Sequence, residues 1–291
     1  MATFKDYNYE HFIVTTPGQF VVHVEINRPK KLNAFSEPVW REFGALFNRL
    51  SHDADVRAIV LSGAGDRAFS AGLDVQSASE GVLGSSIGGD VDPSRFATTM
   101  RRHIVEFQEA IAAVEKCEKP VICVLHGISI GIAIDISCCA DVRICARNTR
   151  FAVKEVDIGL AADIGTLSRL PKLVGSTSWV KDVCLSARDF SGEEALAVGF
   201  VSQIHENKAA ALDAGLRLAG FIASKSPVAV QGTKELLNHA RDHSVAESKQ
   251  FLGSKDLRYT SVWNAAMLQS SDFKAAMTSG LTKTKPTFAK L

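Results

Sequence analysis

The stretch PVICVLHGISIGIAIDISCC, residues 120–139, reads as a strand, a glycine turn and a helix in direct succession. Pro120 opens an apolar run to Leu125 that is typical of a short buried strand. Gly127 and Gly131 mark the turn. The small and apolar residues that follow indicate a buried helix to about Cys139. A strand followed at once by a helix is the building unit of an α/β fold.

The flanking sequence repeats this alternation. Strands are expected at 14–27, as two runs broken by a hairpin turn at 16–19, and at 58–61, 142–146 and 199–204. Apolar spacing predicts helices over 38–50 (with Ser36 as its cap), 98–115, 131–139, 208–224 and 227–241, with others after Gly165, Ser176 and Ser191. Residues 75–93, rich in Gly, Ser and Asp, are expected to form a mobile loop. We therefore predict an α/β chain with a core over 1–225 and a helical region and tail over 226–291.

The overall composition argues against several classes of protein. With 33 Lys and Arg against 32 Asp and Glu, the net charge of +1 gives no support for a nucleic-acid-binding surface. No apolar run reaches the ~18 residues that a membrane span needs, and the first residues lack the apolar centre of a leader peptide. The six cysteines show no CxxC or zinc spacing. We therefore expect buried thiols in a reducing compartment, and neither a metal nor a redox cofactor.

The sequence ends in Ala289-Lys290-Leu291, which differs in one residue from the Ser-Lys-Leu peroxisomal address. The polar residues before this tripeptide suggest an exposed tail. We therefore expect a peroxisomal import receptor to bind it, with a cytosolic location where the signal is not used.

One motif favours a different enzyme class. Residues Gly127 to Gly131 match G-x-S-x-G, the nucleophile elbow of serine hydrolases, between a predicted strand and a predicted helix. However, the later histidines His205, His239 and His243 lie in charged segments, and no HGGG-type oxyanion segment precedes the motif. The apolar neighbours also suit the start of a buried helix. A serine hydrolase stays an alternative.

Two turns in the sequence resemble each other physically. The segment Phe69–Asp74 follows one strand and turn, and His126–Gly131 follows another. Small residues in both let the backbone approach a ligand, so the amides of Leu73 and Ile132 can point at one oxygen. Two convergent amides form an oxyanion hole, worth about 3 kcal/mol per donor where negative charge develops.

Several acids lie in apolar surroundings. Asp135 is the only charge in GIAIDISCCA, residues 131–140, where an unpaired carboxylate is costly unless it is used, partnered or protonated. Glu155 follows in FAVKEVDIGL, residues 151–160, and Asp163 again has apolar flanks in GLAADIG, residues 159–165. Buried acids have raised pKa values and neighbouring acids couple, which suits general acid–base catalysis. A helix cap or a salt bridge is the alternative for each acid, and for Asp157 it is the one we prefer.

Several segments together resemble the enoyl-CoA hydratase/isomerase (crotonase) family, and the resemblance covers nearly the whole chain. Residues 153–166 and 224–231 are more specific, because they resemble the Δ3,5-Δ2,4-dienoyl-CoA isomerase branch. The segments that carry the family resemblance are Asn27–Ala34, Ala68–Asp74, Pro120–Gly127 and Ala140–Arg143.

This resemblance implies a crotonase-like spiral of ββα units with a C-terminal helical trimerisation region, assembled as trimers or dimers of trimers. It also implies a coenzyme A thioester as the ligand and no separate cofactor. Leu73 and Ile132 then supply the oxyanion-hole amides. Asp135 and Glu155 take the positions of two hydratase glutamates, and Asp163 is the acid added in the isomerase. The implied substrate-binding positions are Asn33, Ala34, Ala71, Gly72, Leu73, Asp74, Val75 and Ile132.

The implied reaction converts 3,5-dienoyl-CoA into 2,4-dienoyl-CoA in fatty-acid β-oxidation, by removing a proton at C2 and delivering one at C6. We take Asp135 and Asp163 as the proton-transfer pair, with Glu155 coupled to one of them or sharing its role. An enoyl-CoA hydratase is the alternative within the family, and an RNA-binding or interaction protein is the alternative outside the enzymes.

Two features depart from the family pattern. Ile132 stands where the family has glycine, so its side chain either points away from the ligand or narrows the pocket. Eight extra residues, Lys249–Asp256, interrupt the C-terminal helices. If these residues are helical, they rotate the following face by roughly 80°.

Overall fold

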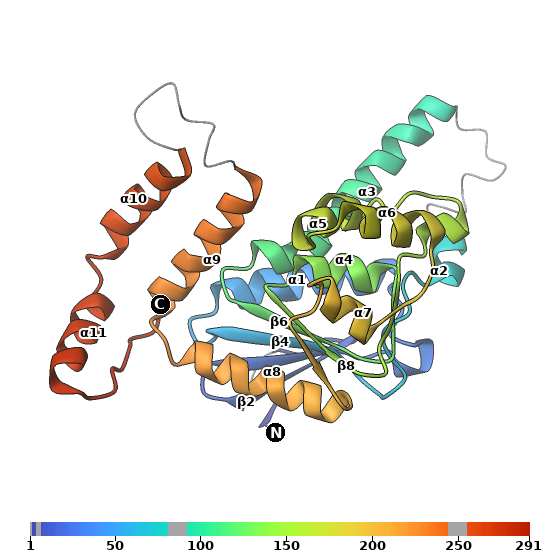
Figure 1. Cartoon of the computed structure of the whole chain (residues 1–291). Coiled ribbons are helices and arrows are strands. Elements are labelled where there is room, and N and C mark those ends of the chain that lie inside the picture. Colours follow the sequence, from blue (N-terminus) through green and yellow to red (C-terminus); the bar gives the residue numbers. More distant parts are fainter. Residues whose placement is uncertain (1, 4–6, 81–91, 244–254) are drawn as a thin grey trace.

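The computed structural model describes residues 2–3, 7–80, 92–243 and 255–291 (Figure 1). Within these residues the larger of two sheets has seven strands. In this sheet β3, β4, β6, β8 and β11 pair in parallel, whereas β1 and β2 form an antiparallel edge. In spatial order the strands are β1 (Ala2–Thr3), β2 (Phe12–Gly18), β3 (Val21–Ile26), β4 (Ala58–Gly63), β6 (Val121–Leu125), β8 (Val142–Ala146) and β11 (Gln203–His205).

A smaller, four-stranded sheet receives the other strands, in the order β10 (Phe190–Ser191), β9 (Arg150–Ala152), β7 (Ile128–Ile130) and β5 (Ala68–Ser70). Three times in succession, one strand joins the larger sheet and the next joins the smaller sheet: β4 then β5, β6 then β7, and β8 then β9. Helical structure follows each of these pairs. The expected spiral of ββα units is therefore confirmed.

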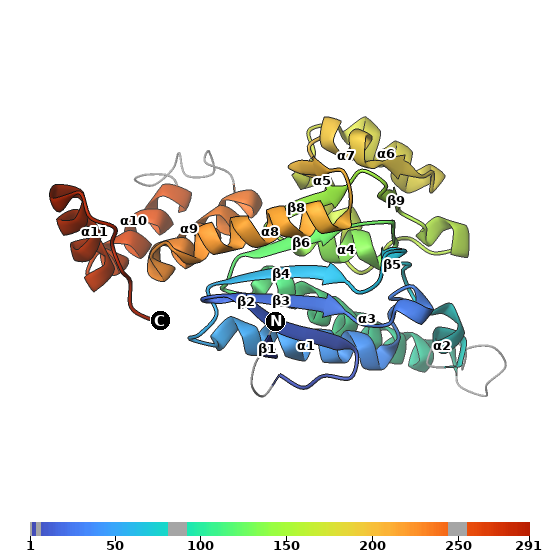
Figure 2. The same cartoon turned by 90° about the horizontal axis from the view of Figure 1, so that it is seen from below.

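Helices cover both faces of the larger sheet (Figure 2). Alternate residues of β4 separate the two cores, because Ile59 and Leu61 belong to one buried cluster and Ala58 and Val60 to the other. The first core lies under α1 (Glu37–His52), α3 (Pro93–Lys116) and α4 (Ile132–Cys139), and the second lies under α8 (Lys208–Ala223). Helix α8 approaches the sheet closely through Gly215, where an added Cβ would lie 2.8 Å from a Val124 methyl. The remaining elements of this part are η1 (Pro29–Lys31), α2 (Val75–Glu80), η3 (Glu155–Ile158), α5 (Thr166–Leu173), α6 (Thr177–Ser186) and α7 (Gly192–Ala197).

The C-terminal helices extend away from the spiral (Figures 1 and 2). They are α9 (Pro227–Asp242), α10 (Lys255–Met267) and α11 (Ser271–Thr282). One anchor is buried: the Lys234 ammonium donates to the Asp141 carboxylate over 2.8 Å and to the Lys119 carbonyl over 3.1 Å. Among the described residues, none of the helices combines the length and apolar character that crossing a bilayer requires.

The expected loop at 75–93 is wrong at both of its ends. Residues 75–80 form α2, because the Asp74 side chain accepts the Ser77 N–H and the Asp74 carbonyl accepts the Ala78 N–H. Helix α3 begins at Pro93 rather than near residue 98, because the Asp92 side chain caps its first turn. The residues between, 81–91, lie outside the described part of the chain.

Two other expectations also differ. The strand expected at 199–204 is limited to Gln203–His205, because Phe200 packs in the core against Phe151 and Phe190. The insertion expected at 249–256 lies outside the described residues up to 254, and α10 begins at Lys255. The six cysteines are buried free thiols, as predicted.

Candidate active site

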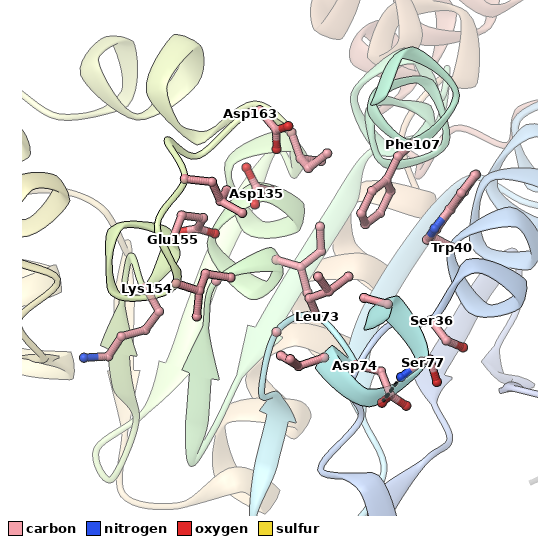
Figure 3. Close-up of a pocket in the computed structure, with 18 of the residues that line it drawn as sticks. Ser36, Trp40, Leu73, Asp74, Ser77, Phe107, Asp135, Lys154, Glu155 and Asp163 are labelled. Atoms are coloured by element: carbon pink, nitrogen blue, oxygen red, sulfur yellow. Dashed lines mark hydrogen bonds between the residues drawn. The ribbon is translucent and has the colours of Figure 1, made fainter. Parts of the chain in front are cut away.

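An apolar pocket lies between the two glycine turns and the helices α1 and α3 (Figure 3). It encloses about 260 Å³. On one wall the rings of Trp40 and Phe107 stack with centroids 4.9 Å apart. The carboxyl groups of Asp135, Glu155 and Asp163 lie together on the opposite wall. Such a pocket suits an apolar ligand that gains or loses protons on one side.

The two glycine turns lie against each other at this pocket. Gly72 and Gly131 have positive φ angles of 96° and 57°, and a Cβ added at Gly131 would lie 3.5 Å from the Gly72 Cα. Leu73 and Ile132 follow these glycines and line the pocket. In the described part of the chain, the amide N–H groups of Leu73 and Ile132 donate to no protein acceptor. Both are therefore available to a ligand oxygen, and the Ile132 side chain contributes to the pocket wall.

Asp135 is the most deeply buried of the three acids, with 1% of its surface exposed. Its Oδ1 accepts two hydrogen bonds of 2.7 Å from Thr166, one from the amide N–H and one from the hydroxyl. Burial raises the pKa of Asp135 to about 6, even though both hydrogen bonds favour the ionised form. This carboxyl is therefore held in place and close to its titration point near neutral pH.

Glu155 stands at the start of η3, beside the glycine turns. A Cβ added at Gly131 would lie 3.5 Å from its Oε1. Its Oε2 is buried and has no hydrogen-bond partner among the described residues. Burial and then the neighbouring Asp135 raise the pKa of Glu155 to about 7. An unpartnered buried carboxyl oxygen is available to exchange a proton with a ligand.

Asp163 lies farther along the same wall, on the exposed side of the pocket. Its backbone carbonyl accepts a 2.6 Å hydrogen bond from the side-chain amide of Gln108 on α3. Burial raises the pKa of Asp163, and His103 opposes that rise. No lysine or arginine of the described chain forms an ion pair with Asp163, Asp135 or Glu155.

The expected substrate-binding positions divide into two groups. Residues Ala71, Gly72, Leu73, Asp74 and Val75 all line the pocket, and so does Ile132. Asn33 and Ala34 do not line it.

Asn33 supports the pocket from beneath. It is fully buried, and its amide donates to the carbonyls of Ala64 and Ala68 while its oxygen accepts the Arg28 N–H. Asn33 therefore holds the turn before Ala71 in place, and its contact with a ligand stays a prediction.

The structure also tests the alternative roles of Ser129 as a nucleophile and of Asp157 in a salt bridge. Ser129 is fully buried in β7, and its hydroxyl donates to the His126 carbonyl, so the nucleophile elbow is not formed. Asp157 pairs with Lys154 at 3.2 Å, as preferred. Arg143 donates to the carbonyls of Ser137, Ala140 and Phe200.

Sequence reasoning missed four residues of this site: Trp40, Phe107, Gln108 and Thr166. Trp40 and Phe107 face the pocket only because α1 packs against α3, a contact between distant parts of the chain. Thr166 could have been found from the sequence. It stands at the expected start of a helix after Gly165, where a free backbone N–H binds a carboxylate favourably.

The comparisons with known proteins agree with this geometry. The model of the enoyl-CoA hydratase/isomerase family matches residues 17–290. The chain is 46% identical over 267 residues to the mitochondrial Delta(3,5)-Delta(2,4)-dienoyl-CoA isomerase of Homo sapiens, covering 92% of this chain and 78% of that protein. It is 40% identical to the peroxisomal Delta(3,5)-Delta(2,4)-dienoyl-CoA isomerase of Arabidopsis thaliana, covering 99% of this chain and 100% of that protein.

A solved structure shares the fold. The enoyl-CoA hydratase from Bacillus anthracis superposes with a TM-score of 0.82 at 22% identity, covering 96% of this chain and 99% of that one. The family match, the relatives and the shared spiral lead to one conclusion. The chain belongs to the enoyl-CoA hydratase/isomerase family.

Proposed function

We propose that this protein isomerises 3,5-dienoyl-CoA to 2,4-dienoyl-CoA. The observation that carries the proposal is a wall of three acids that, among the described residues, have no ion-paired cation, beside two amides that have no acceptor there, in an apolar pocket. Sequence identity to the named isomerases supports the substrate class. The same site can bind an acyl thioester and exchange protons with its acyl chain, whereas unpaired acids do not stabilise a purely structural pocket.

The order of the acids along the wall suggests which carbon each one serves. Glu155 lies next to the glycine turns, and the amides of Leu73 and Ile132 would hold the thioester oxygen there. Carbon C2 is adjacent to the thioester carbonyl, so Glu155 is placed to take its proton. Asp163 lies farther from the turns and is placed to deliver a proton at C6.

The reaction then needs two proton transfers and no net reactant. Glu155 removes a proton from C2, and the electron pair of that C–H bond delocalises onto the thioester oxygen on one side and over the diene as far as C6 on the other. The two amides stabilise this dienolate. Asp163 protonates C6, which leaves double bonds at C2 and C4. No redox or metal cofactor is proposed, because electrons are only redistributed within the substrate.

This assignment changes the proton-transfer pair expected from the sequence, which was Asp135 and Asp163. Both hydrogen bonds to Asp135 converge on one of its oxygens, and the carboxyl is almost completely buried. Glu155 has the unpartnered oxygen. We therefore place Asp135 behind Glu155, where its charge strengthens Glu155 as a base.

The test is a pair of assays on one preparation. We expect 3,5-dienoyl-CoA to be converted to the conjugated 2,4-isomer, followed by the absorbance of the new diene. In D2O the product should carry deuterium at C6. Faster hydration of 2-enoyl-CoA than isomerisation would instead favour the hydratase, and no turnover in either assay would overturn an enzymatic role.

We propose further that the chain assembles as a trimer, or as a pair of trimers, through its C-terminal helices. Exposed apolar side chains on α9, α10 and α11 support this: Leu237, Val262, Met277 and Leu281 are 66%, 64%, 57% and 84% exposed. Light scattering should give three or six times the chain mass of 31.4 kDa, and Leu281→Asp should lower it. A monomer mass for the wild type would refute the proposal.

We propose that the last three residues direct the protein to peroxisomes. Here the tail folds back: Arg57 donates to the carbonyls of Phe288 and Ala289 over 2.8 and 2.9 Å, and Lys290 pairs with Asp55. A receptor would have to displace these contacts. A fluorescent fusion to the first residue should enter peroxisomes only when Ala289–Leu291 is present, and a cytosolic pattern with the tripeptide present would overturn the idea.

A further inference from the structure

Thr166 makes an unusual pair of contacts with the most buried acid. It is the first residue of α5 and is itself fully buried. Its amide N–H and its hydroxyl both donate to the same atom, Asp135 Oδ1, each over 2.7 Å. In the described part of the chain, no donor bonds the other oxygen, Oδ2.

This arrangement restricts where a proton can sit on Asp135. A carboxyl oxygen has two lone pairs that accept hydrogen bonds in the plane of the group. Thr166 uses both lone pairs of Oδ1, so a proton that binds Asp135 goes to Oδ2. Thr166 therefore fixes both the orientation of the carboxyl and the oxygen that titrates.

We propose that Thr166 is a positioning residue for the reaction: by donating twice to Oδ1 it holds Asp135 in place and leaves Oδ2 alone to take or release a proton. The proposal rests on the isomerase function given above, because it needs Glu155 as the base. It makes the charge state of Asp135, and through it the basicity of Glu155, depend on a residue that touches no substrate.

The local backbone holds Thr166 in this position. The preceding Gly165 has φ of 150°, and the Arg169 guanidinium occupies the space that a Cβ there would take. Glu115 in turn holds Arg169 by two hydrogen bonds of 2.8 and 3.0 Å. The N-terminus of α5 also favours an anion at this place.

Few other groups near Asp135 change charge between about pH 5 and 9. Burial raises the pKa of Cys139 to about 12 and that of Cys184 to about 11, so both stay neutral thiols. Arg169 stays a cation. The acidic neighbours are Glu155 and Asp163, and the pKa values of both are raised. The charged and titratable groups that face Asp135 are Cys138, Cys139, Glu155, Asp163, Arg169 and Cys184.

The experiment compares Thr166→Val, which keeps the N–H but loses the hydroxyl, with Thr166→Ser, which keeps both donors. Thr149→Val is the matched control, because Thr149 is a buried threonine outside the pocket whose hydroxyl donates to the carbonyls of Leu125 and Ala146. Where valine prevents folding, Thr166→Ala removes the same hydroxyl without added bulk. Circular dichroism verifies the fold of each variant.

For Thr166→Val we expect kcat to fall about tenfold to a hundredfold, as for a lost hydrogen bond to a charged group, with KM changed less than about threefold. The acid limb of the kcat/KM profile should move to higher pH by about half a unit, because the ionised form of Asp135 loses a donor. Thr166→Ser should restore both, and Thr149→Val should shift neither. An unmoved limb in Thr166→Val, or an equal shift in Thr149→Val, overturns the proposal.

A second readout needs no substrate. Carboxyl carbons are labelled, the Asp135 resonance is assigned by its loss in Asp135→Asn, and its titration is followed by NMR. In Thr166→Val this resonance should titrate at higher pH than in the wild type. If the wild type fails to isomerise dienoyl-CoA, the function is wrong but the titration still decides the role of Thr166, because an unchanged titration contradicts it.

Discussion

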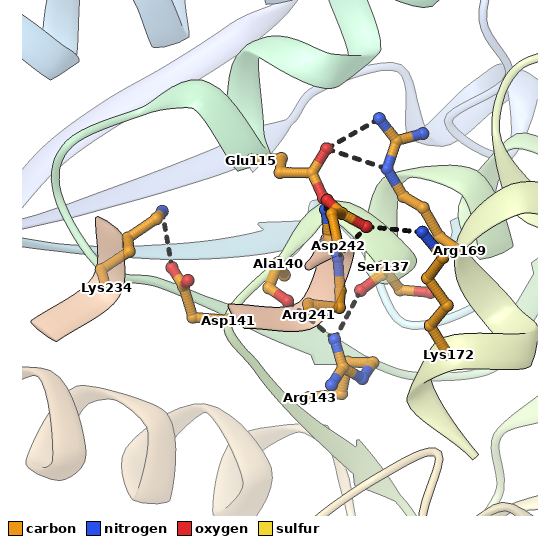
Figure 4. Close-up of polar contacts among 10 residues, drawn as sticks. All are labelled: Glu115, Ser137, Ala140, Asp141, Arg143, Arg169, Lys172, Lys234, Arg241 and Asp242. Atoms are coloured by element: carbon orange, nitrogen blue, oxygen red, sulfur yellow. Dashed lines mark hydrogen bonds and ion pairs between the residues drawn. The ribbon is translucent and has the colours of Figure 1, made fainter. Parts of the chain in front are cut away.

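Two groups of charged residues lie near α5, and the pKa values of their acids shift in opposite directions. The pocket acids are Asp135, Glu155 and Asp163 (Figure 3). The paired cluster consists of Glu115, Arg169, Lys172, Arg241 and Asp242, and it ties α3, α5 and the end of α9 together (Figure 4). Thr166 binds a pocket acid at the start of α5, and Arg169 binds a cluster acid one turn later on the same helix.

The two groups differ in their cations more than in their burial. Burial alone would raise the pKa of Glu115, but hydrogen bonds from Arg169 and Arg241 outweigh it and lower that pKa. Arg241 and Lys172 hold the pKa of Asp242 well below its usual range. The pKa values of the pocket acids move the other way. A buried carboxylate without an ion-paired cation destabilises the folded chain, so the presence of Asp135 and Glu155 without such a partner among the described residues indicates a use.

The largest expected effect is on catalysis, and it comes from a substitution among the pocket acids. Glu155→Gln removes the proposed base while keeping the shape of the side chain. We expect kcat for dienoyl-CoA to fall about 10²- to 10⁴-fold, the usual worth of a general base. Stability at neutral pH should not fall, because no cation loses its partner. Steady-state kinetics and urea unfolding measure the two quantities, and Asp157→Asn is the exposed control. A Glu155→Gln enzyme with near-normal kcat would contradict the assignment.

The next largest effect is on stability, and it comes from a substitution in the paired cluster. Glu115→Gln leaves Arg169 and Arg241 without their shared carboxylate. Removing one partner of a buried pair costs 3–5 kcal/mol, and here the side chains are 16–24% exposed, so we expect about 2–3 kcal/mol at pH 7. Because the pKa of Glu115 is lowered, its contribution is present above the ordinary value of 4.5 and is lost as pH falls through the folded-state value. The kcat of the folded enzyme should change far less than in Glu155→Gln. Equal stability of variant and wild type from pH 5 to 8 would refute this account.

A smaller effect of opposite sign is expected at Asp135. Its pKa is raised from 3.8 to about 6, so the favourable contribution of this group is complete below pH 3.8 and is lost as pH rises through about 6. Asp135→Asn avoids the buried charge, and the amide oxygen can still accept from Thr166. We expect the variant to be more stable by about 1–3 kcal/mol at pH 8, with no gain below about pH 4. Urea unfolding at several pH values measures the difference. A loss of stability at pH 8 would mean that the ionised carboxylate is not a burden.

The sequence was sufficient for much of this comparison and insufficient for the rest. Asp135, Glu155 and Asp163 stand out because charges in apolar segments need a reason, and the resemblance to a family places them together. The smaller sheet was missed, because strands as short as Ile128–Ile130 and Arg150–Ala152 carry too few residues to show a periodic pattern.

The role of each acid could be assigned only from the three-dimensional structure. Nothing in the chain order indicates that both Thr166 donors converge on Asp135, or that Glu155 keeps an oxygen unpartnered. The paired cluster was invisible for the same reason, since Glu115 and Arg241 are 126 residues apart. The sequence could identify acids whose ionised form is unfavourable in apolar surroundings, whereas only the packing of α3, α5 and α9 shows which acids are paired with cations.

The smallest effect sharpens the comparison at the edge of the cluster. Lys172 and Asp242 form an ion pair whose side chains are 47% and 37% exposed. Pairs in such surroundings contribute about 0–1 kcal/mol, because water screens the charges and the lysine loses side-chain freedom. We expect Lys172→Met to lower stability by at most about 0.5 kcal/mol, and 0.5 M salt to remove most of that difference. Asp242 keeps its contact with Arg241, so it is not left unpaired. A loss as large as that of Glu115→Gln would contradict this expectation and would show that the whole cluster acts as one buried unit.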